Sequence, residues 1–106
     1  MRDDSVGKLA ATIAARRTED AEVSYTRQLL DAGPEKCARK FGEEAIELVI
    51  AAMGTDRKSL TGEAADVLYH LIVVLQAKGV AWSEVEAVLD ARMGTSGLAE
   101  KAARPK

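Results

Sequence analysis

The chain has 106 residues, of which 47% are hydrophobic and 30% are charged, and its formal net charge is −2. This length and balance predict one globular domain and argue against a disordered chain. The slightly acidic charge argues against nucleic acid or an anionic membrane as a partner. The single cysteine, Cys37, excludes an internal disulfide and a cysteine-based zinc site, and it fits a reducing, cytoplasmic location.

No segment has the pattern of a targeting or membrane-spanning element. The first ten residues, MRDDSVGKLA, are acidic and contain no long apolar stretch, so we expect no signal peptide. We also expect no transmembrane helix, because no apolar run approaches the roughly 20 residues that cross a bilayer. The sequence therefore predicts an intracellular protein.

Helical signals recur along the chain, and no segment alternates with the period of a strand. Any of the three residues at positions 3–5 can cap a first helix, whose apolar face includes Ile13 and which fades near residues 16–18. Ser24 can cap a short helix that begins at the next residue and ends before Gly33. The short helix is expected to span about six residues, to Leu30.

Two long helices are expected in the middle of the chain. Pro34 is well placed as the first residue of one helix, which runs to about Met53 and stops at a glycine. Residues 54–58 form a short charged connection. The next helix is expected from about Ser59 to Lys78. Two long helices joined by a short loop pack antiparallel, as in a helical bundle.

A last helix and a tail complete the chain. Ser83, with Glu86 three residues later, has the spacing of a capping box and predicts a helix over Glu84–Arg92. The small, polar and basic residues 99–106 are expected to form a flexible tail. One all-α domain over residues 1–98 is therefore expected.

Two groups of acidic residues lie in or beside the apolar runs of the long helices. The first is Glu43, Glu44 and Glu47 in FGEEAIELVIAAM, and the second is Glu63 and Asp66 in GEAADVLYHLIVVL. At about 100° per residue, each group lies on one side of its helix. An ionised carboxylate in apolar surroundings is costly unless it is paired or binds a metal. Because Mg²⁺ prefers carboxylate oxygens and substrate phosphates, the pattern predicts a metal–phosphate site between the helices.

Basic residues precede the first acidic group on the same helix. Lys36 and Lys40 fall almost on one stripe with Glu44 and Glu47, and the stripe starts at a helix N-terminus, where anions are favoured. Both lysines are therefore candidates to bind phosphate. The simpler alternative is a surface ion pair between Lys40 and Glu44, worth a few tenths of a kcal/mol. For His70, the only histidine, a hydrogen-bonded core or interface role is favoured over that of a catalytic base.

At this point the residues resemble a known family. The segments SYTRQLLDAGPEKCARKFGEEAIELVIAA and GEAADVLYHLIVVL are similar to phosphoribosyl-ATP pyrophosphohydrolases, which catalyse the second step of histidine biosynthesis. The resemblance extends from about residue 9 to residue 98. It includes the E-x-x-E and E-x-x-D pairs of the broader all-α MazG-like superfamily, here Glu44-x-x-Glu47 and Glu63-x-x-Asp66. The SYT, GPEK, K-x-GEEA and ADVLYHL segments are more specific than those pairs.

The resemblance implies a fold, an assembly and a reaction. The fold is an all-α MazG-like bundle of four to five helices, in which two long antiparallel helices carry the site, and the assembly is a homodimer. The reaction is hydrolysis of phosphoribosyl-ATP between its α and β phosphorus atoms, giving phosphoribosyl-AMP and pyrophosphate. Since no cyclohydrolase domain accompanies it, the chain resembles the stand-alone form, and functional coupling to a separate phosphoribosyl-AMP cyclohydrolase is a further expectation.

Site residues also follow from the resemblance. The implied Mg²⁺ ligands are Glu44, Glu47, Glu63 and Asp66. The implied substrate-binding residues are Tyr25, Thr26, Lys36 and Lys40. Glu43 or Glu47 would orient the attacking water or take its proton, and the sequence leaves that choice open.

Other functions compete with this one. A house-cleaning MazG-like hydrolase of non-standard nucleoside triphosphates would share the acidic pairs, but the SYT and GPEK segments argue against it. A non-catalytic helical dimerisation module would carry the same carboxylates as surface groups, and it predicts no change of stability with Mg²⁺. A di-iron carboxylate bundle is disfavoured because its usual Glu-x-x-His motifs are absent.

Overall fold

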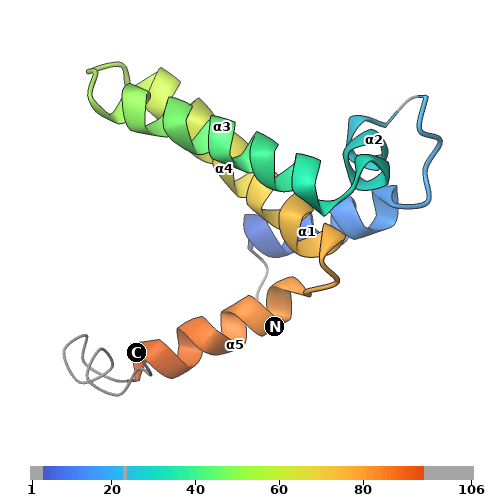
Figure 1. Cartoon of the computed structure of the whole chain (residues 1–106). Helices are drawn as coiled ribbons and strands as arrows, with labels where there is room; N and C mark the ends of the chain where they lie inside the picture. The colour runs from blue at the N-terminus through green and yellow to red at the C-terminus, as the bar shows by residue number, and fades with distance from the viewer. Residues whose placement is uncertain (1–3, 23, 95–106) are drawn as a thin grey trace.

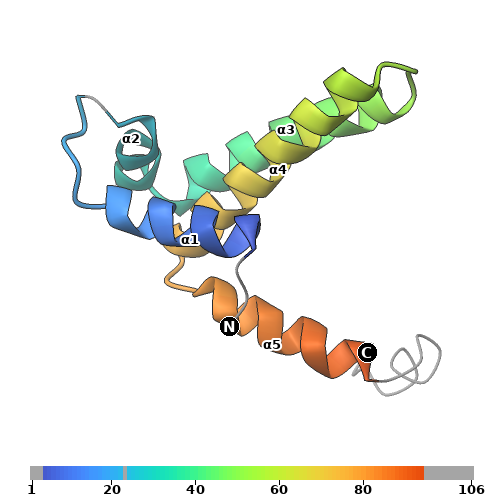
Figure 2. The same ribbon diagram turned by 180° about the vertical axis from the view of Figure 1, so that it is seen from behind.

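The computed structural model describes residues 4–22 and 24–94, and all regular secondary structure within these ranges is helical. Its helices, in chain order, are α1 (Ser5–Arg16), α2 (Tyr25–Ala32), α3 (Pro34–Ala52), α4 (Arg57–Ala77) and α5 (Trp82–Met93). Helices α3 and α4 form a long antiparallel hairpin that projects from a base made with α1 and α2, while α5 leaves the base in another direction (Figures 1 and 2). The expected all-α fold is confirmed for the described residues.

Local signals set most helix ends as expected. The Asp4 carboxylate accepts a hydrogen bond from the Gly7 N–H at 2.6 Å and caps α1. The Ser24 hydroxyl accepts one from the Arg27 N–H at 3.1 Å and caps α2. Between α2 and α3, Gly33 adopts a φ of 101°, which favours glycine over residues with a side chain. Because Pro34 begins α3 directly after this turn, two helices of different direction meet without a loop.

Two expected helix starts are wrong. Helix α4 begins at Arg57 and not at Ser59, because the Asp56 carboxylate accepts from the Lys58 N–H at 3.0 Å and forms the cap. The expected capping box at Ser83 is not formed.

Helix α5 begins at Trp82, which packs against the core, and the Glu84 carboxylate accepts from the Ala81 N–H at 2.9 Å. Tertiary packing of the tryptophan therefore fixes an earlier start than the local pattern indicated.

The short helix α2 extends to Ala32, beyond the expected Leu30. The expected tail over residues 99–106 and the domain boundary at residue 98 lie outside the described residues.

The core is small and lies at the base, where α1 and α2 meet the ends of α3 and α4. Its fully buried apolar residues are Ile13, Leu29, Cys37, Ile72 and Val73. Partly buried residues from the start of α1 and the end of α4 pack around them. The far half of the hairpin contributes no residue to this core, so its stability must come from elsewhere.

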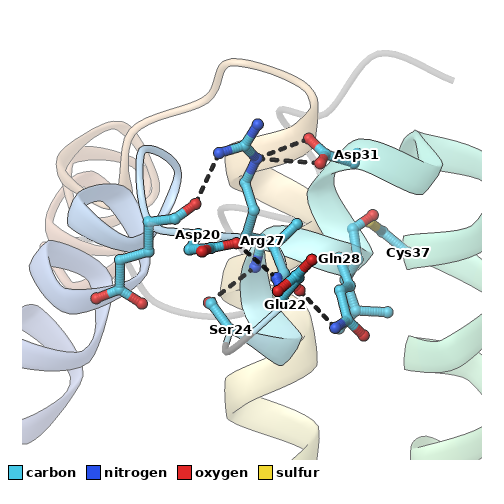
Figure 3. Close-up of polar contacts among 10 residues, drawn as sticks. Asp20, Glu22, Ser24, Arg27, Gln28, Asp31 and Cys37 are labelled. Atoms are coloured by element: carbon cyan, nitrogen blue, oxygen red, sulfur yellow. Dashed lines mark hydrogen bonds and ion pairs between the residues drawn. The ribbon is translucent and has the colours of Figure 1, made fainter.

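The connection between α1 and α2 is held by side chains of α2 (Figure 3). Arg27 donates to the Glu19 carbonyl at 2.7 Å and, through Nε, to both oxygens of Asp31 at 3.0 Å. Gln28 donates to the Ala21 carbonyl at 2.6 Å. These bonds fix the start of α2, and with it the residues of the SYT segment, against the base.

Helix α4 bears on the expectation that the chain has no transmembrane helix. Its 21 residues contain a window of mean hydropathy 1.2, which by length and composition alone is enough to cross a membrane, and only 17% of that window is buried. Helices packed inside water-soluble proteins pass the same test. Two carboxylates, those of Glu63 and Asp66, make a bilayer costly for α4. On a single chain, the apolar residues Leu60 and Leu68 of α4 remain exposed, whereas Ile72 and Val73 are buried in the core.

Candidate metal centre

Three carboxylates meet between the two long helices. Glu44 of α3 and Glu63 and Asp66 of α4 each offer one oxygen, and these oxygens lie within 4.8 Å of one another. Glu44 and Glu63 are partly buried and Asp66 is exposed. Ionised carboxylates this close repel one another unless a cation lies between them. The antiparallel pairing expected from the sequence thus brings together three of the four implied ligands.

The electrostatics of the cluster favour a bound cation. Burial, and then the neighbouring Glu47 carboxyl, raise the pKa of Glu44 above its ordinary value. Burial, followed by the charges of Glu47 and Asp66, likewise raises the pKa of Glu63. The Glu63 Oε2 atom is buried and has no hydrogen-bond partner in residues 4–22 and 24–94. A buried carboxylate oxygen without a donor is satisfied by a cation, and an all-oxygen ligand set suits Mg²⁺.

Glu47 lies beside the cluster, not among its three closest oxygens. Together with Glu63 and Ser59, it lines an open pocket of about 220 Å³, whose apolar wall comes from Ile50 and Ala51. Its side chain is exposed. The carboxylate thus faces solvent and the pocket at once, where a water molecule can reach it. Ser59 was not singled out from the sequence; only its place one turn before Glu63 could have indicated it.

Glu43 is engaged on a different side of α3. Its carboxylate pairs with the Lys40 ammonium at 3.2 Å, and this bond is the main cause of the raised pKa of Lys40. The ion pair weighed for Lys40 thus exists, but with Glu43 as partner in place of Glu44. Tyr25 of α2 also lies close enough to contribute to the raised pKa of Lys40. Lys36, one turn earlier on α3, is exposed.

The two residues of the SYT segment that were singled out face different ways. Tyr25 is about half exposed, whereas Thr26 is 0% exposed. The Thr26 hydroxyl shares a hydrogen bond of 2.5 Å with the Tyr69 hydroxyl of α4. Tyr69 was not identified from the sequence, since a contact across 43 positions leaves no local pattern. The bond joins the start of α2 to the helix that carries Glu63 and Asp66.

His70 is buried and hydrogen-bonded, as the sequence indicated. It is 8% exposed, and its Nδ1 lies 2.9 Å from the Asp66 carbonyl oxygen. Its ring packs edge-on against that of Tyr69, with the ring centres 4.9 Å apart. The buried histidine therefore adjoins the backbone of a candidate ligand.

Comparison with known proteins gives a consistent family. The sequence profile of the family described as phosphoribosyl-ATP pyrophosphohydrolase matches residues 6–93, a range that includes every site residue described above. A phosphoribosyl-ATP pyrophosphatase of Cereibacter sphaeroides is 61% identical over 97 residues, covering 92% of this chain and 94% of that protein. Proteins of the same name from Rhodobacter capsulatus and Dinoroseobacter shibae are 59% and 58% identical, covering 94% and 93% of this chain and 97% of each relative.

Proposed function

Because the chain belongs to the phosphoribosyl-ATP pyrophosphohydrolase family, we propose that its carboxylate cluster holds Mg²⁺ for that reaction. The chain hydrolyses phosphoribosyl-ATP at the α–β phosphoanhydride, giving phosphoribosyl-AMP and pyrophosphate in the second step of histidine biosynthesis. The shared name of relatives at about 60% identity favours this substrate over the non-standard nucleotides of a house-cleaning hydrolase.

The metal assignment depends on the three oxygens within 4.8 Å of one another and on the unpartnered Oε2 of Glu63. Glu44, Glu63 and Asp66 would be the main ligands, and Glu47 would complete the set from the adjoining pocket with one carboxylate oxygen, leaving the other for a water molecule. When bound, Mg²⁺ would neutralise phosphate charge and lower the pKa of a coordinated water.

Glu47 is our candidate for the group that orients the attacking water or takes its proton. Its carboxylate is exposed and lines the pocket with Glu63. Glu43, the other candidate, is paired with Lys40. A carboxylate already bonded to an ammonium is a weaker base, whereas one that faces the pocket can reach a water held there.

The basic residues of α3 would bind the phosphate chain. Lys40 is one turn before Glu44 and is influenced by its charge, so a phosphate bridging the two positions is within reach of both. Lys36 extends the same stripe to the first turn of α3, where free N–H groups favour anions. Tyr25, exposed beside Lys40, would contact the nucleotide. Thr26, being buried, would act indirectly by tying α2 to Tyr69.

A second copy of the chain would complete the site. The pocket of about 220 Å³ is smaller than the 300–1,000 Å³ typical of sites for drug-sized ligands, and phosphoribosyl-ATP is larger than those ligands. An apolar stripe remains exposed on α3 next to the pocket, formed by Ile46, Val49, Ile50 and Met53. We propose that this stripe and α4 pack against the same elements of a partner in a homodimer.

A cytoplasmic location and a downstream partner belong to the same proposal. The one cysteine, Cys37, is a free buried thiol, which suits a reducing compartment. The product phosphoribosyl-AMP would then pass to a separate cyclohydrolase in that compartment.

Pyrophosphate release tests the function directly. Phosphoribosyl-ATP should be turned over only with Mg²⁺, faster than a panel of ribo- and deoxyribonucleoside triphosphates. Glu47→Ala should abolish turnover, while Glu35→Gln, at an exposed position in the first turn of the same helix, should not. Turnover confined to other triphosphates would move the chain to the house-cleaning group. Full activity without a divalent cation would contradict the metal site.

A further inference from the structure

The imidazole of His70 has a defined hydrogen-bonding state. Its Nδ1 lies 2.9 Å from the backbone carbonyl oxygen of Asp66, one turn earlier on α4. A carbonyl oxygen can only accept, so Nδ1 must carry the proton. In the neutral ring, Nε2 then has a lone pair and no hydrogen, and is an acceptor.

This acceptor is buried without a donor. His70 is 8% exposed, and its Nε2 atom has no hydrogen-bond partner in the part of the chain that the structure describes. Buried polar side-chain atoms in native proteins are nearly always paired, so an exception calls for a specific explanation. The Nδ1 bond alone would be enough to hold a core histidine in place, so a purely structural role does not explain the buried, unpaired Nε2.

The surroundings of the ring restrict the kind of donor. The ring is close enough to the Glu44 carboxyl to interact with it electrostatically, and its Nδ1 is bonded to the backbone carbonyl of Asp66. Ionised carboxylates cannot donate. The nearby Tyr69 hydroxyl is already bonded to Thr26. A water molecule of the carboxylate cluster is a donor that can satisfy both the imidazole and the carboxylates.

We propose that His70 is a positioning residue of the metal centre, whose Nε2 accepts a hydrogen bond from a water molecule bound among Glu44 and Asp66. This inference rests on the proposed Mg²⁺ site. The Nδ1–carbonyl bond sets the ring orientation, and the water's own oxygen stays free to face the metal or the phosphorus. His70 thereby links the backbone of one ligand to the water shell of the site.

Replacing His70 by glutamine or by asparagine tests the roles of its two ring nitrogens separately. The glutamine amide reaches about as far as Nε2, and the asparagine amide about as far as Nδ1. If Nε2 holds a water, His70→Gln should keep kcat within about threefold, whereas His70→Asn should lower kcat roughly 10- to 100-fold with little change in KM. Mg²⁺ titrated calorimetrically into the substrate-free proteins should bind more weakly to the asparagine variant only. Equal losses in both variants, or better retention by asparagine, would overturn the proposal.

The wild-type protein gives a test that does not depend on how the variants fold. His70 is the only histidine, so ¹⁵N spectra of tag-free protein report its two ring nitrogens without assignment. We expect the Nδ1–H tautomer in metal-free protein, and a shift of the Nε2 resonance towards a hydrogen-bonded value when Mg²⁺ alone is added. The Nε2–H tautomer would overturn the inference. So would an Nε2 resonance that Mg²⁺ leaves unmoved while calorimetry shows binding; if Mg²⁺ does not bind, the metal site itself fails.

Discussion

The base of the molecule and the far half of its hairpin use the same kinds of apolar residue in opposite ways. At the base, Ile13, Leu29 and Val73 are at most 3% exposed. On the hairpin, Ile46 and Ile50 are 63% and 65% exposed. Both regions are regular helix, so local structure does not account for the difference. The base is packed within one chain, whereas the hairpin presents its apolar surface to something else.

The polar groups of the two regions differ in part. Near the base, Thr26 is bonded to Tyr69, and the Cys37 thiol donates to the Leu29 carbonyl at 3.2 Å, although the indole Nε1 of Trp82 is buried there without a partner in the described residues. Between the long helices, Glu63 has a buried carboxylate oxygen that also lacks a partner in the described residues. An unsatisfied oxygen within a cluster of carboxylates indicates a place for a cation. We therefore expect substitutions on the hairpin to affect ligand binding and self-association.

The largest effect on stability should come from the base. Ile13→Ala removes a side chain that is 1% exposed, and we expect it to lower the free energy of unfolding by roughly 2–5 kcal/mol. The matched change Ile46→Ala on the exposed stripe should leave folding intact and shift the monomer–dimer equilibrium. Chemical denaturation and light scattering over a range of protein concentrations measure the two effects. Similar losses of folding stability in both variants would remove the distinction between the regions.

The largest effect on activity should come from the cluster. Glu63→Gln keeps the shape of the side chain but removes its charge, and we expect kcat/KM to fall by about 100-fold or more. Thermal unfolding without Mg²⁺ should show equal or higher stability, because repulsion with Glu47 and Asp66 is relieved. A variant that loses stability together with activity would indicate that Glu63 is structural.

At Gly62 we expect two smaller effects of opposite sign, a gain in stability and a loss of activity. A methyl group there meets no atom within 4 Å, and the position lies one turn before Asp66 on α4. Gly62→Ala should stabilise the helix by about 0.5–1 kcal/mol and raise Tm by several degrees. We nevertheless expect activity to fall, because Gly62 adjoins Glu63, whose side chain lines the pocket that we assign to the substrate. Thr61→Ala, at the exposed neighbouring position, is the control and should retain activity; unchanged activity in Gly62→Ala would place the substrate elsewhere.

The smallest effect expected is on pH dependence. The pKa values of Glu44 and Glu63 are raised above the ordinary 4.5. A carboxyl group with a raised pKa in the folded state contributes stability below its unfolded pKa and loses it as pH rises through the folded value. Relative to Glu63→Gln, metal-free wild type should thus lose stability as pH rises from 4.5 towards neutrality. Thermal unfolding in chelator at several pH values measures this, and parallel curves for the two proteins would contradict it.

Sequence reasoning succeeded where the signal was local or periodic. The Ser24 cap and the Pro34 start follow from single residues, and the meeting of Glu44 with Glu63 and Asp66 follows from helical period and antiparallel packing. These features depend on few long-range choices.

Sequence reasoning failed where a side chain had several possible partners equally near in the sequence, or where a contact joined residues far apart in the sequence. Lys40 can reach either Glu43 or Glu44, and only the structure selects Glu43. The start of α5 depends on where Trp82 packs, which no local cap records. For the same reason the buried bond between Thr26 and Tyr69 could not be foreseen.

The most direct test of the metal centre is the effect of Mg²⁺ on thermal unfolding without substrate. A ligand that binds only the folded state raises stability by RT ln(1 + [L]/Kd). We expect Mg²⁺ to raise the Tm of the wild-type protein in a concentration-dependent way, and to have almost no effect on Asp66→Asn. A Tm that does not respond to Mg²⁺, or one that responds equally in both proteins, would contradict the assignment of the carboxylate cluster as the metal site.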